Sequence, residues 1–119
     1  MSDFTSLERA VLQEICRQQG EKRAALVAQL STATVARREN SGAGFFIYLS
    51  VNRATSPVMG SDRVLGRVMA TVEGYKGSFD LMLFMEDGYA DFLEGATTGD
   101  DDTTSIDLTT LRFNKNEPW

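Results

Sequence analysis

The apolar residues of this chain change their spacing near residue 44, from a helical period to the alternation of a β-strand. Between residues 5 and 30 they recur three and four positions apart, which is the spacing of one face of an α-helix. From residue 45 onward they alternate with other residues, as in strands that turn one face toward a core. A chain with helices first and strands afterwards is expected to fold as an α+β protein, with its helices on one face of the sheet.

Two short helices are expected in the first 32 residues. Thr5 and Glu8 have the spacing of a capping box, which predicts that a first helix begins there. Gly20 is suited to end that helix. Residues 21–30 predict a second helix, although one bent helix fits the same pattern.

The rest of the chain predicts an antiparallel meander sheet of about five strands. Strands are expected over residues 45–51, 64–72, 79–86, 89–94 and 106–113, and a small strand at 35–39 also fits. Asp87 and Gly88 are typical of a two-residue hairpin turn. Short connections favour antiparallel pairing, because parallel strands need a long crossover. We therefore expect a single α+β domain over residues 1–119, helical over 1–32 and rich in strands over 33–113, with a tail at 114–119.

The absence of histidine and the single cysteine exclude several kinds of chemistry. Without histidine the chain cannot supply a Ser-His-Asp triad or a Cys-His dyad. One cysteine cannot form an intramolecular disulfide or furnish a His/Cys zinc site. No apolar run approaches the roughly 20 residues of a membrane span, and no secretion signal is recognised. We expect a cytoplasmic protein with no catalytic residue, no cofactor and no membrane partner.

Negative charge is concentrated in the second half of the chain. The formal net charge is −5, and residues 86–107 contain eight acidic residues and no Lys or Arg. This segment would repel phosphate, so nucleic acid is not an expected partner. Its first four acids are Glu86, Asp87, Asp91 and Glu94. Glu86 and Glu94 could lie near one another across the sheet and act as a catalytic carboxylate pair, but an acidic docking face for a basic partner is the favoured interpretation.

The aspartates that follow are weak candidates for a cation site. Asp100, Asp102 and Asp107 could together bind calcium. The segment is not an EF-hand, because Ser105 and Leu111 occupy the sixth and twelfth positions, where Gly and Glu are needed. A solvated acidic loop is the default interpretation.

Two of the expected strands carry apolar side chains on both faces. Phe46 and Tyr48 on one strand, and Met82 and Phe84 on another, add a second apolar surface to the sheet. Two helices can cover only one face. The other face is expected to be a partner interface, a ligand cleft or a homodimer surface, unless residues 35–39 and the tail that ends in Trp119 cover it.

Several segments resemble a group of small uncharacterised bacterial α+β proteins. The segments are SGAGFF at 41–46, LGRVMA at 65–70, LFMEDGY at 83–89 and LEG at 93–95. The resemblance implies one bacterial domain and transfers no activity and no catalytic residue. In size and acidity the chain is also similar to some immunity proteins of contact-dependent toxin systems.

Three hypotheses about function follow. The leading one is a non-enzymatic binding protein, similar in kind to an immunity protein or self-associating, that uses an acidic, partly apolar sheet face. Its partner would be another protein with basic groups, or a second copy of the chain. The alternative is a small-molecule binding domain with a cavity between sheet and helices. The third is an enzyme that uses Glu86 or Glu94 together with a metal at the aspartate loop.

Overall fold

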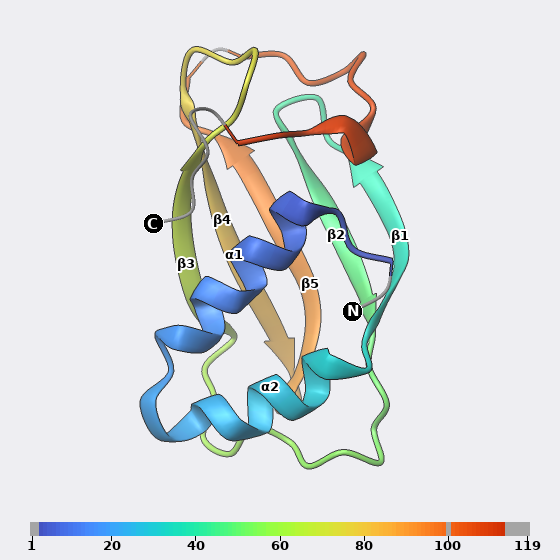
Figure 1. Cartoon of the computed structure of the whole chain (residues 1–119), viewed down its shortest axis with the longest axis vertical. Helices are drawn as coiled ribbons and strands as arrows, with labels where there is room; N and C mark the ends of the chain where they lie inside the picture. Colours follow the sequence, from blue (N-terminus) through green and yellow to red (C-terminus); the bar gives the residue numbers. More distant parts are fainter. Residues whose placement is uncertain (1–2, 100, 114–119) are drawn as a thin grey trace.

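Two helices lie on one face of a five-stranded antiparallel sheet (Figure 1). The computed structural model describes residues 3–99 and 101–113. Helix α1 spans Ser6–Arg17 and α2 spans Arg23–Ser31, and a 3₁₀ turn, η1, joins them at Gly20–Lys22. The expected α+β class with two N-terminal helices is confirmed. In these described residues, neither helix has the length and apolar character that spanning a bilayer would require.

The sheet combines a meander with a hairpin. Its strands are β1 (Thr34–Asn40), β2 (Gly44–Ser50), β3 (Val64–Thr71), β4 (Ser78–Glu86) and β5 (Tyr89–Thr97), and they lie side by side in the order β1-β2-β5-β4-β3. β3, β4 and β5 form a sequential meander, while the β1–β2 hairpin joins it through antiparallel pairing of β2 with β5. The connection from β2 to β3 passes the β4–β5 turn, where the Val58 N–H donates to the Gly88 carbonyl at 2.7 Å.

The edge strand β1 and the segment 106–113 differ in how they match the sequence. The small strand at 35–39 is confirmed as part of β1, an edge strand. The strand expected over 106–113 is wrong, because this segment contains a 3₁₀ turn, η2, at Leu108–Thr110. The Asp107 carboxylate accepts the Thr109 N–H at 2.9 Å and starts that turn. Of the expected strand, only Phe113 forms an isolated bridge, to Val72.

The capping box at the start of α1 is confirmed and does more than cap the helix. The Thr5 hydroxyl accepts the Glu8 N–H, and the Glu8 carboxylate accepts the Thr5 N–H. The same carboxylate accepts two hydrogen bonds of 2.8 Å from the Arg38 guanidinium of β1. Because the Glu8 side chain is 3% exposed, this ion pair fixes α1 against β1 from within the helix–sheet layer.

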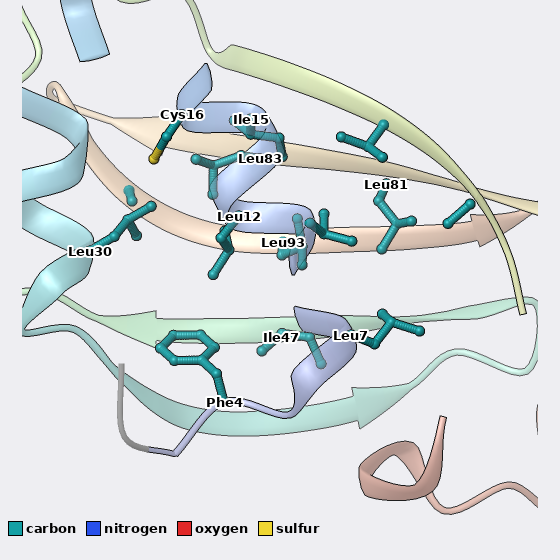
Figure 2. Packing of buried hydrophobic residues seen from close by; sticks show 14 of the residues in the cluster. Phe4, Leu7, Leu12, Ile15, Cys16, Leu30, Ile47, Leu81, Leu83 and Leu93 are labelled. Atoms are coloured by element: carbon teal, nitrogen blue, oxygen red, sulfur yellow. The ribbon is translucent and has the colours of Figure 1, made fainter. Parts of the chain in front are cut away.

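The core fills the layer between the helices and the sheet (Figure 2). Leu7, Leu12 and Ile15 of α1 pack against alternate residues of the strands. The buried strand residues include Phe45, Ile47, Phe79, Leu81, Leu83 and Leu93. A Cβ at Gly66 would lie 2.5 Å from a methyl carbon of Ile15, so this glycine lets α1 approach β3 closely.

Candidate functional site

The face of the sheet that points away from α1 and α2, called here the outer face, carries a cluster of aromatic side chains. Phe92 of β5 lies directly between Tyr48 of β2 and Phe84 of β4 in the strand register. Its ring stacks on Phe84, with 4.6 Å between centroids, and lies 5.7 Å from Tyr48 and 5.9 Å from Phe46. Met82 continues this surface along β4. All five side chains are half-buried rather than sealed inside the molecule.

The helices leave this cluster uncovered because they occupy the opposite face (Figure 1). Along β4 every second residue is buried against the helices, and Met82 and Phe84 take the alternate positions. Residues 35–39 extend the sheet sideways as β1 and do not cover the outer face. The tail, to which the sequence also assigned a covering role, lies outside the described residues.

Glu94 places a carboxylate in the middle of the aromatic cluster. It lies on β5 between Phe46 of β2 and Met82 of β4, and it is half-buried. Within residues 3–99 and 101–113, its carboxylate forms no ion pair and no side-chain hydrogen bond. A carboxylate with apolar neighbours and no internal cation is suited to accept a cation from outside the chain.

Three arginines surround the cluster, each engaged in its own contact. The Arg37 guanidinium lies 4.3 Å from the Tyr48 ring centroid and 3.6 Å from the Glu39 carboxylate. Arg67 is paired with Asp80 at 2.7 Å, a contact that raises the pKa of this guanidinium. Arg63 lies 5.9 Å from the centroids of two cluster rings, those of Phe84 and Phe92. The outer face therefore has an acidic centre and a mixed rim.

The remaining acidic candidates of the hairpin do not join Glu94 at one site. Asp87 has a φ of 54° and Gly88 one of 83°, which confirms the expected tight turn between β4 and β5. Asp91 lies at the register irregularity of β5. Glu86 pairs with Tyr89 at the end of the ladder, whereas Glu94 faces Met82. Four residues of strand separate the two glutamates, about 13 Å, so they do not form a close carboxylate pair.

The aspartate loop is organised by hydrogen bonds within the chain. Asp101 accepts the Gly77 N–H at 2.9 Å, and Asp102 accepts the Thr104 N–H at 2.8 Å. Hydrogen bonds from Thr104 and from Thr109 lower the pKa of Asp102 and of Asp107, respectively. Asp100 lies outside the described residues. Within the described ranges, no three acidic or thiol side chains come together as a metal-binding group would.

The single cysteine lies beside a hollow between the two helices. Burial raises the pKa of the Cys16 thiol to about 11. The hollow has a volume of about 210 Å³ and is lined by residues of α1 and α2, among them Leu12, Cys16, Val27 and Leu30. It is a groove between helices, whereas the sequence suggested a cavity between helices and sheet, a layer that the core cluster occupies.

Comparisons with known proteins supply no relative for this chain. No protein-family model matches it, and no curated protein and no solved structure shows significant similarity to it. The resemblance to small bacterial proteins therefore stays a prediction.

Sequence reasoning placed four of the five cluster residues on a second apolar face but missed the central one. Phe92 and Leu93 point to opposite faces of β5. The side chains that lie next to Phe92 on the outer face depend on the pairing of β5 with β2. That pairing joins segments far apart in the chain. The rim residues Arg37 and Arg63 were missed for the same reason, since their ring partners lie on other segments.

Proposed function

We propose that this chain is a non-enzymatic protein-binding domain whose outer face binds a basic, partly apolar segment of another protein. The observation that carries the proposal is Glu94, a half-buried carboxylate surrounded by Phe46, Met82 and Phe92 and paired with no cation among the described residues. A partner's Lys or Arg would pair with this carboxylate. The apolar part of the same segment would lie on the rings.

The energetics of such a surface favour a few central residues. Aromatic side chains that become fully desolvated commonly dominate binding, while contacts at the rim contribute little. Phe92 contacts three other rings of the cluster, so its position is already fixed before a partner binds. A preorganised surface loses less side-chain freedom on binding.

The charge around the cluster supports a role for electrostatics in specificity. Glu94 favours a cation at the centre, whereas Arg37 and Arg63 disfavour one near the rim. A symmetric contact between two outer faces centred on Glu94 would place two carboxylates together. A different protein with a basic centre therefore fits this face better than a second copy does.

Selection of random peptides on the immobilised protein tests the proposal without a known partner. Selected sequences should combine Lys or Arg with aromatic or aliphatic residues. Their affinity should fall about tenfold in Glu94→Gln and in Phe92→Ser, and it should weaken with added salt. Glu21→Gln, an exposed change on the helix side, is the matched control.

Mapping of backbone amide shifts on peptide binding gives the decisive readout. Shifts concentrated on β2, β4 and β5 support the proposal. Shifts around the groove between α1 and α2, or equal affinity for all variants, would contradict it.

A further inference from the structure

The two edges of the sheet differ in how their backbone groups are satisfied. β3 forms one edge and β1 the other. Residues that directly follow α1 cover part of the β3 edge: the side-chain amide of Gln18 donates to the Arg67 carbonyl and that of Gln19 to the Leu65 carbonyl, both at 2.9 Å. Side chains thus occupy two of the acceptors that another strand would need.

The edge of β1 has no such closure. The Ser41 N–H donates to the Gly44 carbonyl at 3.0 Å, so Ser41 and Gly44 form a hydrogen-bonded pair. The next pair along the ladder is that of Asn40 and Phe45. Because hydrogen-bonded and non-hydrogen-bonded pairs alternate in an antiparallel ladder, the backbone groups of Glu39 and Arg37 point toward β2. Those of Arg38 and Asn40 point outward. In the part of the chain that the structure describes, no hydrogen bond reaches these outward groups.

We propose that β1 pairs antiparallel with β1 of a second copy, around a two-fold axis at Arg38. In this register Arg38 of each copy donates its N–H to, and accepts through its C=O from, Arg38 of the other. Arg37 then lies opposite Glu39 of the second copy, and Glu39 lies opposite its Arg37. Two opposite-charge pairs form on the outer side of the joined sheet.

Charge selects this register over its neighbours. An axis at Arg37 would place two arginines opposite each other, and an axis at Glu39 would place two glutamates opposite each other. At Arg38 the side chains that meet on the helix side are also like-charged, but each is neutralised by Glu8 of its own chain. The self-complementary order Arg37-Arg38-Glu39 thus fits a second copy of this strand.

Space beside β1 is consistent with this pairing. An open hollow of about 460 Å³ lies beside β1 and is lined by Asp3, by residues of the strand and by residues 106–109. Ala36, Arg37 and Glu39 are exposed. The inference goes beyond the proposed function, because it uses an edge of the sheet rather than the outer face.

Reciprocal charge reversal is the test. Sedimentation velocity over a wide concentration range should show wild-type protein dimerising. Arg37→Glu and Glu39→Arg should each weaken the dimer about tenfold, since each variant places two like-charge pairs across the axis. The combined variant restores opposite charges and should restore most of the affinity.

Controls separate this surface from the outer face. Arg112→Glu changes the net charge as Arg37→Glu does, at an exposed position away from β1, and should leave the dimer intact. Glu94→Gln should do the same. Amide hydrogen exchange at Arg38 and Asn40 should slow as the concentration rises. A protein that stays monomeric at every concentration, or a dimer that responds to neither reversal, would overturn the inference.

Discussion

Gln29 joins three separate parts of the molecule although it is fully buried. Its side-chain amide N–H groups donate to the carbonyls of Ser56 and Gly88, and its carbonyl oxygen accepts the Ala90 N–H at 3.0 Å. These groups belong to the β2–β3 connection and to the β4–β5 hairpin. A buried polar side chain whose donors and acceptor are all used stabilises one arrangement of the loops around it.

Replacing Gln29 by Leu should lower the free energy of unfolding by about 2–3 kcal/mol, because buried backbone groups lose their partner. Denaturant titration measures the change. Gln13→Leu, an exposed substitution on α1, should alter stability by less than about 0.5 kcal/mol. Equal effects for the two variants would show that the Gln29 hydrogen bonds do not matter.

Cys16 predicts a dependence of stability on alkaline pH. Burial raises the pKa of its thiol from an ordinary value of 9.0 to about 11 in the folded chain. The unfolded chain therefore releases the proton first, and stability should fall as the pH rises from about 9 to about 11. Thermal unfolding of wild type and Cys16→Ala across this range should diverge. Alkylation of the folded thiol with a midpoint near the ordinary pKa would contradict the prediction.

At the scale of elements, α1 and β1 depend on a buried ion pair. Glu8 caps its own helix and binds Arg38 of β1, and the Arg38 side chain is 20% exposed. The pairing raises the pKa of Arg38 above its ordinary value. A carboxylate this deeply buried is costly once its cation is removed.

Arg38→Met should therefore lower the free energy of unfolding by about 2–4 kcal/mol. The double variant Glu8→Gln, Arg38→Met should lose less than the sum of the two single changes, as a double-mutant cycle would measure. Arg17→Met breaks the exposed pair with Glu14 and should lose less than about 1 kcal/mol. Additive single changes would argue against direct coupling.

Elements defined by local signals were predictable from the sequence. The Thr5–Glu8 capping box marks α1, and Asp87-Gly88 marks the β4–β5 turn. The strand prediction over residues 106–113 was wrong because Asp107 makes a local hydrogen bond that competes with strand pairing. β1 gave a weak signal, since an edge strand does not need one apolar face.

The composition of the candidate site could be predicted only in part. Alternation assigned Phe46, Tyr48, Met82 and Phe84 to faces of their own strands. Which strands are neighbours follows from the pairing of β2 with β5, which no local pattern encodes. The position of Glu94 at the centre of the cluster depends on that pairing, as does its distance from Glu86.

At the scale of the whole molecule, the two proposed surfaces are compatible with each other. Pairing through β1 would extend the sheet sideways and leave the outer face of each copy accessible. A dimer would then present two aromatic clusters on one continuous sheet. A partner with two basic segments would bind it more tightly than a partner with one.

The glutamines that directly follow α1 should control how far assembly proceeds. Gln18→Ala combined with Gln19→Ala removes the side chains that occupy the edge of β3. Light scattering of concentrated samples should then show species larger than a dimer, because the Leu65 and Arg67 carbonyls become available to a further strand. A size distribution unchanged from wild type would contradict this.

Side chains that cover one edge of the sheet also decide whether assembly through the other edge is finite. A sheet that can add copies at both edges grows without limit, whereas one with a single usable edge stops after one addition. The side chains of Gln18 and Gln19, which directly follow α1, would thus help to keep the proposed dimer finite.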